Sequence, residues 1–166
     1  MSGFSPVADD RTRLLILGSM PGVRSLHQSQ YYAHPRNAFW PIVSQLFGIS
    51  ADLNYQDRLT SLRDCGVGLW DVLHDCDRKG SLDSNIVRSS EVPNDIPAML
   101  TRCPELVAIG FNGQAARKLF NRHFKNDLGV FTDLRLIDLP SSSPAYASLS
   151  VSEKTELWKR SLSFVI

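Results

Sequence analysis

The sequence predicts an α/β fold, a three-layer α/β/α sandwich with a central, mostly parallel four-stranded sheet. Four short apolar runs each end at a loop rich in Gly, Pro, Ser or Asn. Unbroken apolar runs of this length are typical of strands that are buried on both faces of a parallel sheet. Segments with helical spacing lie between the runs, and this alternation is typical of α/β domains.

The predicted elements follow one another in a simple order. The strands are expected at residues 14–17, 67–70, 106–109 and 134–137. Helices are expected at about residues 37–47, 56–65, 95–103 and 113–124. Gly66 ends the second helix, and the third ends before Pro104. A last helix begins at Ser150, which has capping-box spacing to Glu153, and runs towards the end of the chain.

The length and the charge limit what the protein can be. A chain of 166 residues fits one compact domain, so we expect a single domain over residues 1–166. The apolar fraction of 43% and the charged fraction of 21% are ordinary for a globular protein. The formal charge of +1 lacks the excess of basic residues that is typical of nucleic-acid-binding proteins. Any contact with DNA is therefore expected to be local.

The sequence has no sign of export, membrane insertion or a metal site. Residues 1–6 lack a basic stretch followed by an apolar run, and no segment reaches the roughly 18 apolar residues of a membrane span. Cys65, Cys76 and Cys103 are odd in number and widely spaced, so we expect reduced structural thiols. These features favour a cytoplasmic monomer with no membrane contact and no obligate protein partner.

The topology also predicts where a ligand binds. In an open parallel sheet, ligands collect beyond the carboxyl ends of the strands, where helix N-termini and irregular loops meet. The loops that follow the predicted strands are residues 18–36, 71–94, 110–113 and 140–146. We therefore look for functional residues in these four loops.

The first of these loops carries the most specific pattern. Residues 18–22 read Gly-Ser-Met-Pro-Gly, and residues 31–40 read Tyr-Tyr-Ala-His-Pro-Arg-Asn-Ala-Phe-Trp. The stretch resembles the first motif of the uracil-DNA glycosylase superfamily. It is most similar to two branches, the hypoxanthine-DNA glycosylases and the mismatch-specific uracil and thymine glycosylases. In the mismatch-specific branch, Gly-x-Asn-Pro-Gly precedes His-Pro-x-Asn-x-Phe-Trp at the same distance. The resemblance covers nearly the whole chain, strongly over residues 18–40, 68–85 and 139–146 and weakly elsewhere.

One departure from the family pattern determines which mechanism we expect. The family's catalytic Asn falls on Met20, whose thioether cannot orient water. The hypoxanthine-DNA glycosylases share Gly-Ser-Met-Pro-Gly and have an essential Asn later in the motif, which matches Asn37. The resemblance therefore implies that Asn37 positions the water, since an amide offers both a donor and an acceptor. Alternatively, Asn37 caps the helix that follows.

The resemblance also implies a set of base-binding residues. The flipped base would stack on Tyr32, which could instead be a core residue, while His34 would bond a base or a phosphate or simply fix its own loop. Asp71 ends the second strand where the family reads the base edge. Its carboxylate would accept a hydrogen bond from an N–H of the base, or it would cap the turn that follows. The implied base-binding residues are Gly18, Ser19, Met20, Tyr32, His34, Asp71 and Asn85.

The loop at residues 139–146 reads Leu-Pro-Ser-Ser-Ser-Pro-Ala-Tyr. Successive serines between prolines form a stiff turn whose hydroxyl and N–H groups suit a DNA phosphate. The loop resembles the His-Pro-Ser or Asn-Pro-Ser segment of the family, with Ser141 in place of the His or Asn. Relatives use a bulky residue, the wedge, to fill the space that the flipped base leaves in the stack. Ala145 is small for the wedge position, so Tyr146 is the expected wedge. The expected DNA-binding residues are Ser141, Ser142, Ser143, Pro144, Ala145, Tyr146 and Gly113.

The resemblance implies a monofunctional DNA-deoxyinosine (hypoxanthine-DNA) glycosylase that acts on DNA containing deaminated bases. Such an enzyme flips the base out of the helix and hydrolyses its N-glycosidic bond without a cofactor or metal. No Lys stands at a motif position suited to Schiff-base chemistry. A uracil-DNA glycosylase is the nearest alternative, because uracil shares the lactam group. A non-catalytic DNA- or nucleotide-binding module is the alternative from another class.

Overall fold

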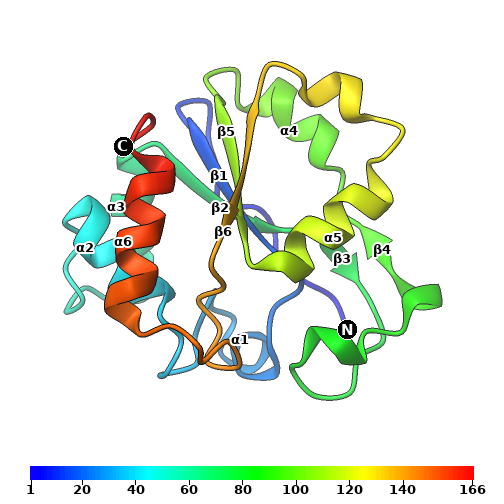
Figure 1. Ribbon diagram of the computed structural model, residues 1–166, viewed down its shortest axis with the longest axis horizontal. Coiled ribbons are helices and arrows are strands. Elements are labelled where there is room, and N and C mark those ends of the chain that lie inside the picture. Colours follow the sequence, from blue (N-terminus) through cyan, green and yellow to red (C-terminus); the bar gives the residue numbers. More distant parts are fainter.

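A computed structural model describes residues 1–166, and the main sheet in it has four parallel strands in the order β2-β1-β5-β6. The strands are β1 (Leu14–Gly18), β2 (Val67–Asp71), β5 (Ala108–Asn112) and β6 (Arg135–Leu139). All three strand pairs are parallel, and helices lie on both sides of the sheet (Figure 1). The predicted α/β sandwich is thereby confirmed.

Each central strand contributes to two separate hydrophobic cores. Leu15 and Leu17 of β1 belong to one core, while Leu14 and Ile16 belong to the other. Successive side chains of a strand point to opposite faces of the sheet, so a strand covered on both faces must be apolar at every position. All five residues of β1 are buried. This double burial explains the unbroken apolar runs in the sequence.

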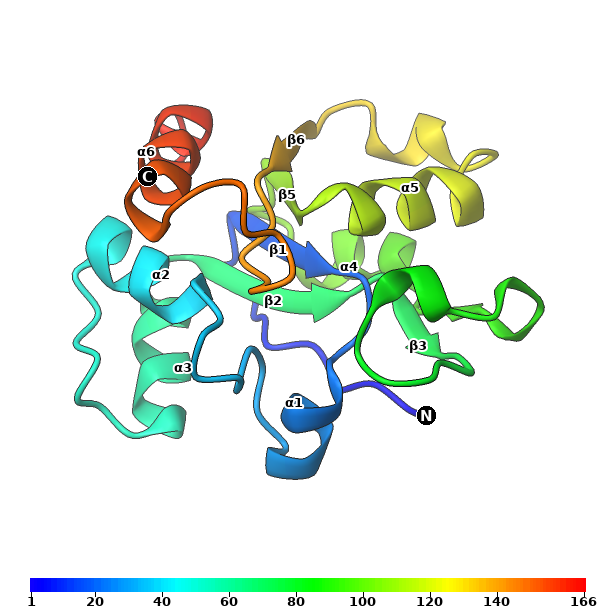
Figure 2. The same ribbon diagram turned by 60° about the horizontal axis from the view of Figure 1, so that its bottom comes forward.

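Three helices cover one face of the sheet and two cover the other (Figure 2). The helices α2 (Phe39–Phe47), α3 (Tyr55–Asp64) and α6 (Val151–Leu162) pack on the first face. The other face is covered by α4 (Ile96–Arg102) and α5 (Gln114–His123). None of these helices has the length and the apolarity needed to cross a lipid bilayer.

Several observed elements differ from the predicted ones. The third strand begins at Ala108 rather than at residue 106 and extends to Asn112. It includes Gly110, where an added Cβ would lie 2.9 Å from the side chain of Leu139 on the neighbouring strand. The strand thus continues through Gly110, where the neighbouring strand leaves no room for a side chain, although a glycine interrupts the apolar run in the sequence.

Six short elements were not predicted. They are α1 (Val23–Gln28), the antiparallel pair β3 (Leu73–Asp75) and β4 (Val92–Pro93), and the 3-10 helices Asp83–Asn85, Arg88–Ser90 and Leu128–Phe131. All of them lie in the connections between the larger elements. They are too short to produce a period that can be recognised in the sequence.

The last helix holds the serine-rich loop, residues 140–146, against the molecule. Trp158 donates from Nε1 to the carbonyl oxygen of Pro140 at 2.9 Å. Lys154, whose side chain is buried, donates from Nζ to the carbonyl oxygens of Tyr146 at 2.7 Å and Ser143 at 3.3 Å. Both ends of the loop are therefore fastened to α6.

The capping box predicted for α6 is confirmed. The hydroxyl of Ser150 accepts a hydrogen bond from the N–H of Glu153 at 3.2 Å, and the carboxylate of Glu153 accepts one from the N–H of Ser150 at 2.7 Å. The two bonds satisfy N–H groups that have no partner within the helix.

We expect Ser150→Ala to lower the free energy of unfolding by about 1 kcal/mol, which corresponds to a fall of about 2–4 °C in melting temperature for a chain of this length. Thermal unfolding followed by circular dichroism measures the change. Ser152→Ala is the matched control, because Ser152 is exposed in the same helical turn and makes no hydrogen bond through its side chain. Equal melting temperatures for the two variants would contradict a contribution from the cap.

Candidate active site

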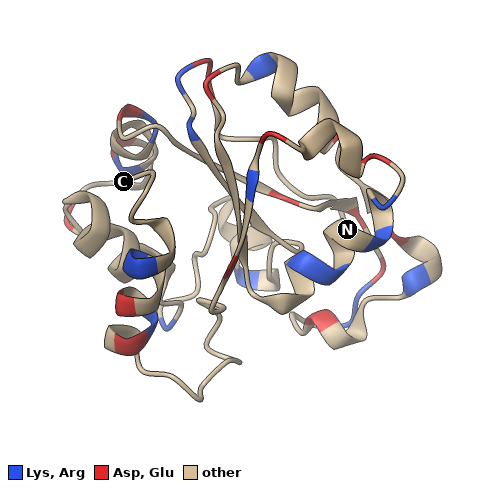
Figure 3. Ribbon diagram, turned by 45° about the horizontal axis from the view of Figure 1, so that its top comes forward, with Lys and Arg blue, Asp and Glu red and all other residues tan.

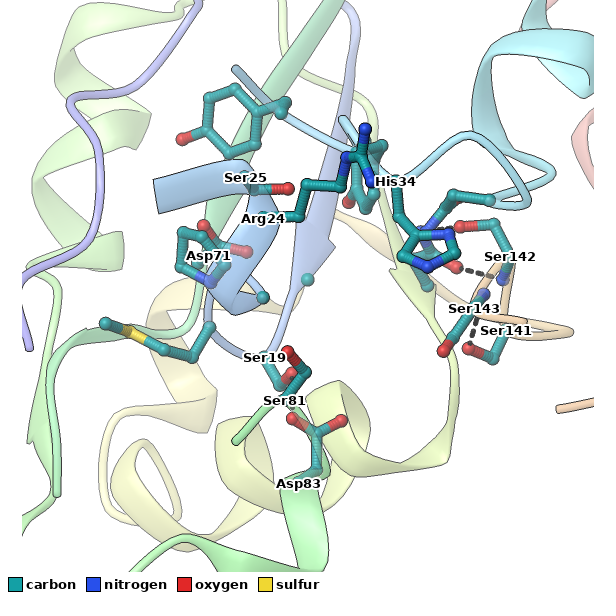
Figure 4. A pocket seen from close by; sticks show the side chains of 18 of the residues that line it. Ser19, Arg24, Ser25, His34, Asp71, Ser81, Asp83, Ser141, Ser142 and Ser143 are labelled. Atoms are coloured by element: carbon teal, nitrogen blue, oxygen red, sulfur yellow. Dashed lines mark hydrogen bonds between the residues drawn. The ribbon is translucent and has the colours of Figure 1, made fainter. Parts of the chain in front are cut away.

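A pocket opens where the carboxyl ends of the parallel strands meet their loops. Figure 4 shows the serine-rich loop and His34 on one side of it, and Asp71 and Asp83 on the other. Most of the predicted site residues line this pocket: Gly18, Ser19, Met20, Tyr32, His34, Asn37, Asp71, Ser141, Ser142, Ser143 and Pro144. The structure thus brings together segments that are more than 100 residues apart in the sequence.

The loop after β1 contributes backbone to the pocket. A Cβ at Gly18 would lie 2.4 Å from Oδ1 of Asp71 and 3.2 Å from the hydroxyl of Tyr32, so only glycine fits there. The thioether of Met20 is buried in the hydrophobic core. The N–H groups of Ser19, Met20 and Gly22 donate to no other atom of the protein. Free N–H groups at a pocket wall can stabilise negative charge on a ligand.

Arg78 holds this loop from behind. Its guanidinium is buried and donates to the carbonyl oxygens of Met20, Pro21 and Gly80. In a trans peptide the N–H points away from the carbonyl, so the bond to Pro21 turns the N–H of Gly22 in the opposite direction. The sequence analysis did not identify this role, and nothing in the local pattern distinguishes Arg78 from its exposed neighbour Lys79.

Asp83 completes the support of the first loop. Its carboxylate accepts a hydrogen bond from the hydroxyl of Ser19 at 2.7 Å and lies 3.7 Å from the guanidinium of Arg78. Burial raises the pKa of Asp83, while the bond from Ser19 and the charge of Arg78 act in the opposite direction. Asp83, rather than the predicted Asn85, therefore lines the pocket from this segment.

Tyr32 lies in the pocket wall in an unusual conformation. Its backbone has a φ of 55°, in the left-handed region that residues other than glycine rarely occupy. Its ring stacks on Phe39, with the ring centroids 4.0 Å apart and 23° between the planes. The hydroxyl is buried without a partner, and burial raises the pKa of Tyr32. Because Phe39 covers one face of the ring, a planar base can stack only on the other.

Asn37 has a local partner and a free group. Its Oδ1 accepts a hydrogen bond from the N–H of Phe39 at 2.9 Å, while the N-cap of α2 is Ala38. Asn37 therefore closes the turn before the helix but is not its N-cap, which was the alternative interpretation. Its NH₂ group donates to no atom of the protein, and the side chain lines the pocket. The same amide can therefore also hold a water molecule.

His34 partly fixes its own loop. Its Nδ1 accepts from the N–H of Arg36 at 3.1 Å. An accepting Nδ1 assigns the proton of the neutral imidazole to Nε2. His34 thereby offers an N–H donor at the edge of the pocket.

Ser142 joins three segments of the site. Its N–H and its Oγ both pair with the side-chain amide of Asn112 at 2.8 Å, and its carbonyl oxygen accepts from the N–H of Ala38 at 2.9 Å. Ser142 is 1% exposed. The N–H, the carbonyl oxygen and the hydroxyl oxygen of Ser142 already have protein partners, which leaves only its O–H for the predicted contact with DNA. Asn112 was not predicted, although it ends a buried strand at the ligand-binding edge.

The hydroxyl groups of Ser141 and Ser143 are free to donate, but some N–H groups of the loop are already bonded. The N–H of Ser143 donates to Oγ of Ser141 at 3.2 Å, and the N–H of Ala145 donates to Oγ of Ser143 at 3.2 Å. Both serines line the pocket and are half-buried. The expected contact with phosphate therefore rests on the hydroxyl groups.

Gly113 does not offer the phosphate-binding N–H that was expected. Its N–H already donates to the carbonyl oxygens of Phe111 at 2.9 Å and Leu139 at 3.0 Å. The residue has a φ of 98°, and an added Cβ would lie 2.8 Å from Cβ of Ser141. Gly113 is therefore needed for the close approach of the serine-rich loop.

Besides Gly113, three predicted residues lie outside the pocket. Asn85 is exposed and donates from Nδ2 to the carbonyl oxygen of Lys79 at 2.9 Å, which leaves it away from the proposed base. Ala145 is also exposed, and Tyr146 is 41% exposed next to the ammonium of Lys154, 5.2 Å from the ring centroid. An exposed aromatic ring beside the pocket is compatible with a wedge.

The charges around the site are few. Arg24 is the one Lys or Arg side chain that lines the pocket. Elsewhere, Lys and Arg alternate with Asp and Glu over the ribbon, as Figure 3 shows. No group of three or more His, Cys, Asp or Glu side chains is placed to hold a metal ion. The pocket thus combines free N–H donors, an aromatic ring, a free amide and serine hydroxyls.

Known proteins resemble the chain over two thirds of its length or more. A "Hypoxanthine DNA glycosylase" from Methanosarcina acetivorans is 36% identical over 155 residues, which cover 93% of both chains. Another, from Methanosarcina barkeri, is 40% identical over 113 residues, which cover 68% of this chain and 70% of the other. A solution NMR structure from M. acetivorans, described provisionally as a uracil DNA glycosylase, has a TM-score of 0.80 and 33% identity, covering 99% of this chain and 97% of the other.

The family model of the uracil DNA glycosylase superfamily matches residues 5–162. This match spans all the strands and helices that form the pocket. The chain therefore belongs to the uracil DNA glycosylase superfamily.

Proposed function

We propose that this protein is a monofunctional hypoxanthine-DNA glycosylase of base-excision repair. The main structural support is the free NH₂ group of Asn37 in a pocket where the thioether of Met20 is turned into the core. The names of the two Methanosarcina relatives support the same substrate. Loss of the family's first-loop Asn is thus matched by another amide in the same pocket.

The geometry supports a hydrolytic mechanism. The hydroxyls of Ser141 and Ser143 bind the DNA backbone, and the flipped base stacks on the open face of Tyr32, which contributes roughly 1–3 kcal/mol. As the glycosidic bond breaks, the free N–H groups of the first loop stabilise the negative charge on the base. Water held by the amide of Asn37 then attacks the anomeric carbon.

The proposed product is an abasic site. Since no Lys lines the pocket, an amine that could form a Schiff base with the sugar is not part of its wall. Hydrolysis requires water alone, so we propose no cofactor. DNA is the proposed partner of this monomer and the cytoplasm its compartment, where the free thiols of Cys65, Cys76 and Cys103 stay reduced.

Uracil is the second candidate substrate. It presents the same adjacent N–H and C=O groups as hypoxanthine, so a wall that reads a lactam accepts both bases. The difference lies in the second ring of the purine, which needs more space beside Tyr32. A module that binds DNA without catalysis would use the same pocket but leave the glycosidic bond intact.

We expect the protein to release hypoxanthine from duplex DNA, with weaker or no release of uracil. Duplexes that contain hypoxanthine, uracil, xanthine or only normal bases, cut with alkali at abasic sites, measure the preference. Release of uracil alone would make uracil the substrate. Binding to all duplexes without any release would favour the non-catalytic module.

The variants Asn37→Ala and Asn37→Ser separate the two roles of Asn37. We expect both to slow single-turnover release of hypoxanthine by at least roughly 100-fold, about 2.7 kcal/mol, because both remove the amide. Serine retains an oxygen that caps the turn, so only Asn37→Ala should lose about 1 kcal/mol of stability. Asn85→Ala is the control, since Asn85 lies outside the pocket. A folded Asn37→Ser protein with the rate of the wild type would rule out this assignment.

Tyr146→Ala tests the wedge. An inserted aromatic ring offsets part of the cost of unstacking a base pair, and this cost is absent in single-stranded DNA. We therefore expect a larger loss of rate on duplex than on single-stranded substrate. Leu157→Ala, which removes an exposed apolar side chain from the neighbouring helix, should affect neither rate. Equal losses of rate on duplex and single-stranded DNA would show that Tyr146 is not a wedge.

A further inference from the structure

The pocket contains a buried carboxyl group that has no partner. Asp71 is 3% exposed, and its Oδ2 lies fully buried without a hydrogen bond. No N–H or O–H group of the protein donates to Oδ1 either, and the amide of Asn94 donates to the backbone carbonyl of Asp71 rather than to its carboxyl group. A carboxylate removed from water without donors is strongly destabilised, and such a group takes up a proton instead.

The groups around Asp71 do not supply the missing stabilisation. Arg78 is the nearest cation, but its guanidinium is already bonded to three carbonyl oxygens of the loops. The negative charge of Asp83 also disfavours ionisation of Asp71 and raises its pKa. The remaining titratable groups that face Asp71 or line the pocket with it are Tyr31, Tyr32, Tyr55, Arg24 and His34.

A second buried polar atom lies near the same carboxyl group. The hydroxyl of Tyr32 is also buried without a partner, and both groups border the space left by the missing side chain of Gly18. Two unpartnered buried polar groups at one pocket wall are rare in folded proteins and indicate a ligand that completes their hydrogen bonds.

We infer that Asp71 acts as a neutral acid, whose carboxyl O–H donates a hydrogen bond to the lactam oxygen of the flipped base and transfers its proton as the base departs. This inference rests on the proposed function and deepens it. The sequence analysis expected the opposite polarity, an ionised Asp71 that accepts an N–H of the base. Burial without a donor is the reason for the difference.

The proton and electron balance of the step is simple. The electron pair of the bond between the sugar carbon and the base nitrogen goes to the base, and the proton of Asp71 neutralises the charge that collects on the lactam oxygen. Water adds to the sugar carbon and releases one proton to solvent. After the neutral base leaves, solvent returns one proton to Asp71. The sum is hydrolysis of the glycosidic bond.

The need for such a donor follows from the serine-rich loop. Where the resembling family segment carries a His or Asn, this chain has Ser141, whose hydroxyl is a weaker acid than an imidazolium. Burial, with a contribution from Asp83 and against that of Arg78, raises the pKa of Asp71 to about 8. The group is thus protonated at neutral pH. Above this pKa, its negative charge would repel the lactam oxygen.

The test is the pH dependence of single-turnover release of hypoxanthine. The rate of the wild type should be level below pH 8 and fall about tenfold per unit above it, as the acid loses its proton. Asp71→Asn retains size and polarity but has no proton to transfer, so its rate should be lower by roughly 100-fold or more and lose this fall. Asn37→Ser should release hypoxanthine more slowly than the wild type but show the same fall in rate above pH 8. The N–H of hypoxanthine itself titrates in mildly alkaline solution, and its effect would persist in Asp71→Asn.

A measurement on the free protein is independent of activity. The side-chain carboxyl carbon of Asp71, followed by carbon NMR and identified by its absence in Asp71→Asn, should titrate with a midpoint near 8. A midpoint near 4, or the same alkaline fall in Asp71→Asn as in the wild type, would overturn the inference and leave the proposed function intact. Failure to release any base would overturn both, even with a protonated Asp71.

Discussion

The paired hydrogen bonds between Ser142 and Asn112 are the interaction on which the rest of the site depends. They join the end of β5 to the loop after β6, and the bond from Ala38 adds the start of α2. Each bond contributes only about 0.5–1.5 kcal/mol, but a buried group left without a partner costs about 1–3 kcal/mol. The three segments must therefore move together or not at all. Asn37, next to Ala38 in the chain, is positioned by this junction.

The opposite wall is organised by charge. Arg78 binds the carbonyl oxygens of Met20 and Pro21, which turns the N–H of Gly22 in the opposite direction and leaves it without a protein partner. The same guanidinium is shared with Asp83, so little of its charge is left for Asp71. One buried cation thus orients a backbone donor of the pocket and, because its own bonds are already made, leaves the neighbouring carboxyl of Asp71 without a partner. The free N–H groups of this wall suit a ligand that becomes negative.

Sequence reasoning predicted the fold well, because double burial produces apolar runs that local patterns reveal. It also placed most site residues, since a loop such as residues 18–22 keeps its spacing on the way to the pocket. It could not identify Arg78 or Asn112, whose roles depend on segments far away in the chain. The raised pKa of Asp71 was equally out of reach, because it depends on a burial that only the assembled pocket creates.

The buried ammonium of Lys154 has a consequence for how the protein meets DNA. It lies beneath the loop that is proposed to bind the backbone, bonded only to neutral carbonyl oxygens. Burial lowers the pKa of Lys154, but no anion cancels its charge. A cation beneath this loop attracts a phosphate that lies over it, and each such contact releases a salt ion from the DNA. In a chain of net charge +1, few phosphates are held at once, so encounters with undamaged DNA are brief and the protein moves rapidly from one stretch to the next.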